Sequence, residues 1–292
     1  MKSYMMPIAM ITGIILHKYM GGFSFLTPCL IALMLLFAYC DISFKTIRFT
    51  RCHLQLVIIQ VFGSIGVYLL LVTVHPVIAQ GAMICVLAPT ATSAPVITGM
   101  LGGNVASLTA YSLLGNMTII IMAPVVFAFT GEVNAASLID SIWVVFRKVF
   151  ILLFAPLFGA LLLQKFLPVI HCEIRKAKSL PFYLWIAALV IITGKTVQFI
   201  LDQENPDYII EISVALAALV ICVVQFLIGR GLGRVYGDTI AGGQGLGQKN
   251  TILAIWMAQT YLNPVSAIGP GAYVLWQNMV NSYQVWKKRK QM

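Results

Sequence analysis

Apolar runs of about the length of a membrane-spanning helix follow one another along almost the whole chain. Short polar, charged or Pro/Gly-rich segments separate them. A helix that crosses a bilayer needs about 20 apolar residues, so the pattern predicts about ten transmembrane helices and no sizeable domain outside the membrane. The first run is short and fits a tilted or partial span. The predicted spans are 4–16, 23–39, 54–74, 76–101, 105–129, 149–166, 181–201, 208–229, 239–262 and 265–285.

The fourth and ninth spans carry helix-breaking residues near their centres. In the fourth, Pro89 and Pro95 flank a polar segment, and in the ninth several glycines lie within 241–250. Ten spans divide into two sets of five, and because five is odd, the second set crosses the membrane in the opposite sense. Since the interruptions fall at equivalent places in the two sets, the sequence predicts two inverted five-helix repeats.

Two interrupted helices predict a binding site near the middle of the membrane. Unwound backbone is tolerated there only inside protein or beside a wet cavity, and a helix that restarts points free N–H groups at the occupant, which favours an anion. Thr92 and Ser93 are suitable N-caps for the half-helix that continues through Pro95, while Gly245 and Gly247 permit the second break. The alternative is two simple kinks, since Pro and Gly are common in transmembrane helices.

Lys249 falls near the centre of the ninth span. A cation at that depth costs on the order of 2.5–3.5 kcal/mol and normally faces a polar interior with a partner. The span contains no acidic residue. The predicted partner of Lys249 is therefore the substrate or backbone carbonyls, and in the alternative interpretation Lys249 is only a structural tether to carbonyls of the break.

Composition narrows the class of protein. Of the 292 residues, 60% are hydrophobic and 10% are charged, whereas an ordinary soluble domain carries about 25% charge. This excludes a soluble enzyme and a disordered chain. The net charge of +10 forms no basic stripe on a polar fold, so no nucleic-acid partner is predicted.

The positive charge indicates an orientation in the membrane. Most Lys and Arg residues fall on one side of the ten-span topology, which predicts a multi-pass protein of the plasma (inner) membrane with both termini in the cytoplasm. The basic tail 287–292 is interpreted as an orientation anchor, with a lipid-binding or regulatory patch as the alternative.

The sequence gives little support for a metal site or a catalytic site. The six cysteines follow no paired spacing, and none of the four histidines lies mid-span beside another ligand type. We expect no enzyme activity, no cofactor and no protein partner; the expected partners are the lipid bilayer and a small organic anion.

Three linked motifs resemble the bile acid:sodium symporter family, including its bacterial homologues. They are the Pro-Thr break followed by Gly-Asn-Val-Ala at 103–106, the Gly-Gln-Lys-Asn-Thr break at 247–251, and Trp-Gln-Asn at 276–278. The resemblance extends in order and spacing over essentially the whole chain. It implies an all-α integral membrane fold in which a panel domain (1–53 and 145–202) lies beside a core domain (54–130 and 208–286). The core helices broken near 88–104 and 241–251 would cross at their unwound centres.

The resemblance assigns roles to individual residues. Gln60 is similar to the sodium-site glutamine, Thr92 and Asn250 to substrate-facing residues, and Gln277 and Asn278 to the polar pair on the last span. The sodium sites depart from the family pattern, because Ala94-Pro95 replaces a Ser-Asn pair, Gly245 replaces the shared carboxylate, and Lys249 replaces a glutamine. Ser112 fits on the fifth span, whereas the second hydroxyl position is Leu108, with Ser107 and Thr109 beside it. The predicted substrate-binding residues are Thr92, Ser93, Gln248, Lys249, Asn250, Thr251, Gln277 and Asn278, and the predicted ion or coupling residues are Gln60, Thr109, Ser112 and Lys249.

The sequence therefore predicts a secondary transporter that carries an organic anion by alternating access. The anion would be bile-acid-like, a sterol conjugate, or a small hydroxy or oxo acid. Our hypothesis is that the Lys249 ammonium stands where relatives hold sodium, which makes transport sodium-independent: uniport, exchange, or proton coupling through Lys249. A sodium symporter with atypical ligands stays open as the alternative, followed by a channel or passive receptor and then a membrane-embedded enzyme.

Overall fold

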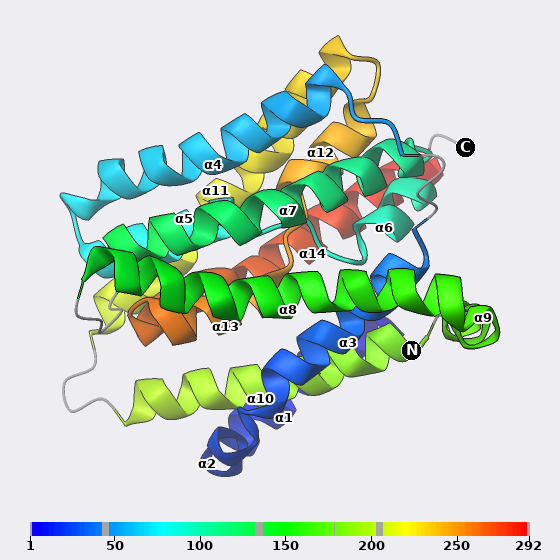
Figure 1. Cartoon of the computed structure of the whole chain (residues 1–292). Coiled ribbons are helices and arrows are strands. Elements are labelled where there is room, and N and C mark those ends of the chain that lie inside the picture. The colour runs from blue at the N-terminus through cyan, green and yellow to red at the C-terminus, as the bar shows by residue number, and fades with distance from the viewer. Residues whose placement is uncertain (1, 43–46, 132–136, 178, 203–206, 291–292) are drawn as a thin grey trace. The chain divides into compact units, whose positions relative to one another are not determined.

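A computed structural model describes residues 2–42, 47–131, 137–177, 179–202 and 207–290 (Figure 1). Within these ranges every regular secondary-structure element is a helix. The one β-type pairing in the described residues is an isolated bridge between Thr90 and Lys249. The all-α prediction is confirmed for this part of the chain. The chain divides into two compact units, Met1–Ile42 with Trp143–Asp207, and Ser43–Ile142 with Tyr208–Met292.

Several helices have the length and composition of membrane spans. Five described helices qualify individually, and a sixth span results if His17–Phe23 and Leu26–Cys40, which meet at 69°, are counted together. The structure is therefore compatible with an all-α multi-pass membrane protein. The five helices are α4 (Arg51–Val72), α7 (Val105–Thr130), α8 (Leu138–Phe166), α10 (Leu180–Leu201) and α11 (Tyr208–Val235).

The first unit is built around α10. This helix packs against α1, α2 and α3, and the approach of α1 to α10 is close because glycines face each other at the contact. A Cβ atom on Gly13 would lie 2.6 Å from the Val190 carbonyl oxygen, and one on Gly194 would lie 2.9 Å from the Gly13 carbonyl oxygen. The other elements of this unit are α1 (Lys2–Ile15), α2 (His17–Met20), η1 (Gly21–Phe23), α3 (Leu26–Cys40), α9 (Pro168–Lys176) and most of α8.

The second unit is built around α11, which packs against α12, α14 and α5, while α4 packs against α5 and α7 (Figure 1). Buried side chains of α4, α7 and α12 share one apolar cluster, and those of α5, α11 and α14 share another. The other helices of this unit are α5 (Pro76–Leu87), α6 (Ala94–Met100), α12 (Thr239–Gly247), α13 (Thr251–Tyr261), η3 (Pro264–Ala267) and α14 (Ile268–Lys290).

Several helices extend beyond the predicted spans. Arg147 and Lys148, expected in a loop before the sixth span, lie inside α8, and Arg230 and Arg234, expected in the loop after the eighth, lie inside α11. The reason is physical: a helix can continue past the apolar segment because a long basic side chain carries its charge to water without breaking the backbone, so the charges did not mark the helix ends.

The basic tail is also helical. The lysines at 287, 288 and 290 lie in the last turns of α14, and the Lys288 ammonium donates to the Leu101 carbonyl at the end of α6. Residues 291 and 292 of the predicted tail lie outside the described residues.

Candidate binding site at two interrupted helices

The first interruption lies between α5 and α6. Helix α5 ends at Leu87, Pro89 follows, and helical structure resumes at Ala94. Four consecutive carbonyl oxygens at the end of α5 each accept a hydrogen bond from a side chain, which satisfies acceptors that a broken helix would otherwise leave buried and unpaired. The donors are Gln225 Nε2 to Cys85 (3.2 Å), Lys249 Nζ to Val86 (2.8 Å), and Gln60 Nε2 to Leu87 (2.7 Å) and to Ala88 (3.0 Å).

The second interruption is shorter than the glycine pattern suggested. Helix α12 continues through Gly245 to Gly247, so only residues 248–250 are unwound. Asn250 starts α13, and its Oδ1 accepts a hydrogen bond from the Leu253 backbone N–H at 3.2 Å. Glycines of α12 serve packing instead: a Cβ atom on Gly242 would lie 2.9 Å from Gly233 Cα of α11.

The two interruptions lie side by side and complete each other's backbone hydrogen bonding. Ala91 N–H donates to the Gln248 carbonyl at 2.9 Å, and Asn250 N–H donates to the Pro89 carbonyl at 2.8 Å. The Thr90 hydroxyl adds a bond to the Gly245 carbonyl at 3.0 Å. The unwound segments therefore form a short antiparallel bridge inside one unit, which we call the crossing.

Lys249 is buried at the crossing, with 1% of its surface exposed. Its Nζ donates to the Val86 carbonyl, and its backbone N–H donates to Gln277 Oε1 at 2.8 Å. Within the described ranges its ammonium forms no ion pair. Lys249 Nζ lies at the C-terminal end of α5, where the helix dipole favours positive charge. Of the two sequence interpretations, the carbonyl tether is the contact that the structure contains.

Tyr111 fills the space beside Gly245. The Tyr111 hydroxyl donates to Gln60 Oε1 at 2.8 Å. A Cβ atom on Gly245 would lie only 2.7 Å from Tyr111 Cδ1, closer than real contacts allow. The ring thus occupies the place in which a carboxylate side chain at position 245 would begin.

The polar residues at the start of α6 differ from expectation in one respect. Ser93 occupies the N-cap position, but its hydroxyl makes no capping bond and instead accepts a hydrogen bond from Gln248 Nε2 at 2.9 Å. The predicted cap at Ser93 is therefore wrong, because Ser93 has helical backbone angles (φ −84°, ψ −12°) and not the extended angles that a capping residue normally has. Thr92 is half-buried, and Ser93 is exposed.

The remaining predicted residues are distributed around the crossing and on α7. Thr251 is buried in the first turn of α13, and Asn278 Nδ2 donates to the Val274 carbonyl within α14 at 2.6 Å. On α7, Thr109 donates to the Val105 carbonyl of its own helix at 2.8 Å, and Ser112 is half-buried. In the described part of the chain, Thr109 therefore forms no hydrogen bond at the crossing. Predicted residues that do form hydrogen bonds there include Gln60, Gln248, Lys249, Asn250 and Gln277.

Sequence reasoning missed a second set of buried amides. Gln244 Nε2 donates to Asn281 Oδ1 at 3.0 Å and to Gln284 Oε1 at 3.2 Å, which links α12 to α14. Gln277 and Asn281 are four residues apart and lie along one face of α14, whereas Gln244 lies in α12 and Gln248, four residues later, lies in the unwound segment. Amide side chains at this spacing inside apolar helices are a signal that could have been read from the sequence.

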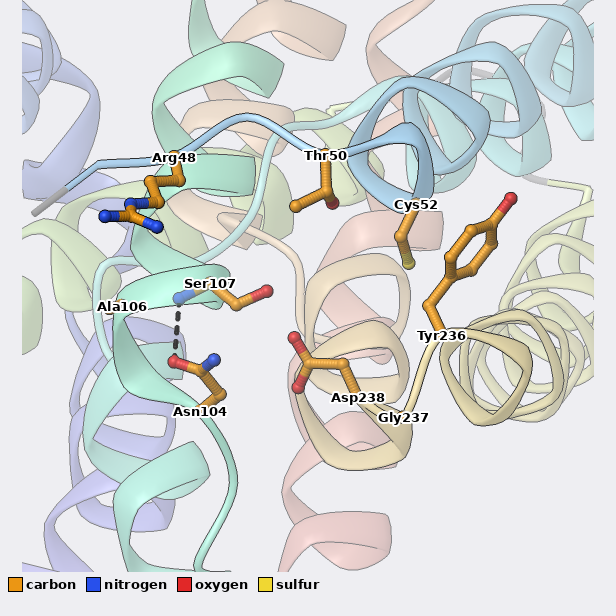
Figure 2. A pocket seen from close by; sticks show the side chains of 9 residues that line it. All are labelled: Arg48, Thr50, Cys52, Asn104, Ala106, Ser107, Tyr236, Gly237 and Asp238. Atoms are coloured by element: carbon orange, nitrogen blue, oxygen red, sulfur yellow. Dashed lines mark hydrogen bonds between the residues drawn. The ribbon is translucent and has the colours of Figure 1, made fainter.

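A cavity lies elsewhere in the same unit. It has a volume of about 380 Å³, and none of the predicted binding residues lines it (Figure 2). Its walls come from the residues before α4, the start of α7 and the turn between α11 and α12.

Comparison with known proteins assigns no family. No family model matches the chain, and no curated protein matches its sequence.

Proposed function

We propose that this protein is a secondary transporter that moves a small or amphipathic organic anion across the membrane by alternating access. The observation that carries the proposal is the crossing, in which two interrupted helices pair through Thr90 and Lys249. Paired broken helices at membrane depth are the arrangement that transporters use to hold a substrate between two repeats. The family resemblance of the motifs, with ten spans in two inverted repeats, is part of this proposal.

The division of the chain supports a moving-domain mechanism. One unit contains both interrupted helices, and the other is formed by the N-terminal helices together with α9, α10 and most of α8. We propose that the unit with the interrupted helices acts as the core and that the other unit acts as the panel. In the proposed cycle the core unit carries the bound anion, and the panel unit gives it access to one side of the membrane at a time.

The charge at the crossing supports an anionic substrate. Lys249 brings a buried positive charge that no described acidic residue neutralises. Helix α13 begins directly after it, so the N-terminal N–H groups of this helix add a positive partial charge. A carboxylate or sulfate that reaches the crossing would be attracted by both.

The same geometry supports coupling without sodium. Two cations at the same place repel each other, and the Lys249 ammonium already occupies the C-terminal carbonyls of α5 together with Gln60. Tyr111 fills the space that a carboxylate at position 245 would need. We therefore propose that Lys249 replaces the sodium ion, and that the anion moves by uniport, by exchange, or with a proton carried by Lys249.

The test is the thermal stability of the purified protein in sodium, potassium or choline, with and without bile acids, sterol sulfates and 2-oxo acids. An anion at 100 times its dissociation constant should stabilise the protein by about 2.7 kcal/mol. We expect this gain to be equal in the three salts, to disappear in Lys249→Met, and to persist in Lys195→Met, which removes another lysine from an apolar helix.

Transport is then measured in proteoliposomes. Saturable counterflow of the stabilising anion supports the proposal, whereas unsaturated flux without counterflow indicates a channel. A stability gain that requires sodium would replace the proposal with sodium symport through atypical ligands. No stabilisation or counterflow with any of these anions would overturn the transporter assignment.

A further inference from the structure

The cavity of about 380 Å³ lies where three candidate spans begin or end. Thr50 directly precedes α4, Asn104 directly precedes α7, and Asp238 lies in the turn after α11. Since these helices are at least as long as the hydrocarbon core is thick, we expect their ends at the depth of the lipid headgroups. The volume falls at the lower end of the range for small-ligand pockets.

The hydrogen-bond directions at one wall are fixed by His53. Its Nδ1 accepts a hydrogen bond from the Thr50 backbone N–H at 3.3 Å, and a backbone N–H can only donate. In the neutral ring the proton is therefore on Nε2, which donates to Ser107 Oγ at 2.8 Å. Because Ser107 Oγ already accepts this bond, its own hydrogen is left for the cavity.

Two further side chains are also left as donors. Asn104 Oδ1 accepts from the Ser107 backbone N–H at 3.1 Å, so the amide nitrogen of Asn104 remains available (Figure 2). Thr50 Oγ1 accepts from the His53 backbone N–H at 3.4 Å, which leaves the Thr50 hydroxyl hydrogen. The neutral part of the wall thus presents hydroxyl and amide donors, which suits an anionic group.

The cavity also contains one charge of each sign. Arg48 lies on one side, and the Asp238 carboxyl group points into the space that Ser107 and Asn104 face (Figure 2). Among the residues that the structure describes, neither Arg48 nor Asp238 forms an ion pair. A ligand that satisfies the whole wall therefore needs an anionic group for Arg48 and the neutral donors, and a cationic N–H group for Asp238.

We propose that this cavity binds a phosphoethanolamine group, with the phosphate on Arg48, Ser107 and Asn104 and the primary ammonium on Asp238. Arginine and hydroxyl donors match phosphate oxygens. A carboxylate accepts N–H hydrogen bonds from a primary ammonium, whereas a quaternary ammonium offers none and is usually held by an aromatic cage. The depth of the cavity favours the headgroup of phosphatidylethanolamine as the source, with soluble phosphoethanolamine esters as the other source. This site does not depend on the transport mechanism.

Binding is measured on the delipidated full-length protein in detergent, by native mass spectrometry and thermal shift. The probes are phosphatidylethanolamine, phosphatidylcholine and phosphatidylglycerol with identical acyl chains. We expect phosphatidylethanolamine to bind about tenfold or more tightly than phosphatidylcholine, since a hydrogen bond between charged groups is worth about that factor. Asp238→Asn should remove this preference, and the control Asp140→Asn, at the exposed start of α8, should retain it.

Arg48→Gln changes an exposed side chain and should keep the fold, so lipid binding to this variant is the second test. It should weaken binding of all three lipids while the preference for ethanolamine over choline remains. Competition by glycerophosphoethanolamine would identify the soluble ester as a ligand, and its failure to compete would identify the lipid. Equal binding of the three lipids, tightest binding of phosphatidylglycerol, or a preference that survives Asp238→Asn would overturn the proposal.

Discussion

Tyr111 controls which side chains position 245 can carry. The ring lies in contact with the backbone of α12 at Gly245, and its hydroxyl is held by Gln60, so the ring cannot swing away without loss of a buried hydrogen bond. A single residue on α7 thus keeps a carboxylate out of the crossing.

Gly245→Ala should destabilise the protein by about 1–3 kcal/mol, because the added methyl group overpacks against Tyr111. Thermal unfolding in detergent measures the change. The control is Gly271→Ala on α14, where a Cβ meets nothing within 4 Å and should be neutral or slightly stabilising. An unchanged melting temperature for Gly245→Ala would show that Tyr111 can move aside.

Lys288 offers a second prediction at the scale of one side chain. Lys288→Met removes the bond to the Leu101 carbonyl and should speed amide hydrogen exchange in 98–104, which connects α6 to α7. Lys287→Met, which alters an exposed neighbour, should leave this exchange unchanged. Equal exchange in both variants would mean that the tail only sets orientation.

At the scale of elements, the sequence predicted the helix starts correctly where a helix coincides with an uninterrupted apolar run. The predicted starts at Val105 and Tyr208 are the observed starts of α7 and α11, and both interruptions were placed at the right segments. Helix α9 was missed, because nine residues with alternating polar and apolar character look like a loop between spans. Pro168 at its first turn was the available signal.

The two helix starts at the crossing should respond differently to loss of their polar residue. Asn250→Ala removes the observed cap of α13 and should cost about 1 kcal/mol, within the usual 0.5–2 kcal/mol range. Ser93→Ala should cost less, since its hydroxyl caps nothing and, because Ser93 is exposed, water can replace the hydroxyl as the acceptor for Gln248 Nε2. Thermal unfolding of the two variants measures the difference, and an equal loss of stability would contradict the assignment of Asn250 as the cap.

At the scale of the whole molecule, the crossing joins segments that are distant in the chain. The sequence indicated that both helices break and that Lys249 lies at the second break. It did not indicate that Lys249 donates its hydrogen bond to Val86, because every residue has a backbone carbonyl and the residue type does not reveal which one accepts. The Tyr111–Gly245 contact was hidden for a similar reason, since it depends on the packing of α7 against α12.

The proposed topology predicts the reactivity of the cysteines. Among the six cysteines, only Cys29 and Cys172 are exposed, and Cys29 lies within an apolar helix. An impermeant maleimide should therefore label Cys172, in α9, in inside-out vesicles but not in intact cells. Cys172→Ser should abolish the signal. Labelling of Cys172 in intact cells would reverse the orientation of the protein.

The bridge at the crossing can form only after the ribosome has synthesised both of its segments. Thr90 and the Gly245 carbonyl that it binds are 155 residues apart. At about 5–20 residues per second, the ribosome needs about 8–30 s to deliver the second segment after the first. During that interval the Pro89 carbonyl and the Ala91 N–H lack the partners that they have in the folded protein. We therefore expect the newborn chain to need shelter for its first broken helix during this interval, and chains that terminate before Gln248 to be degraded faster than the full-length protein.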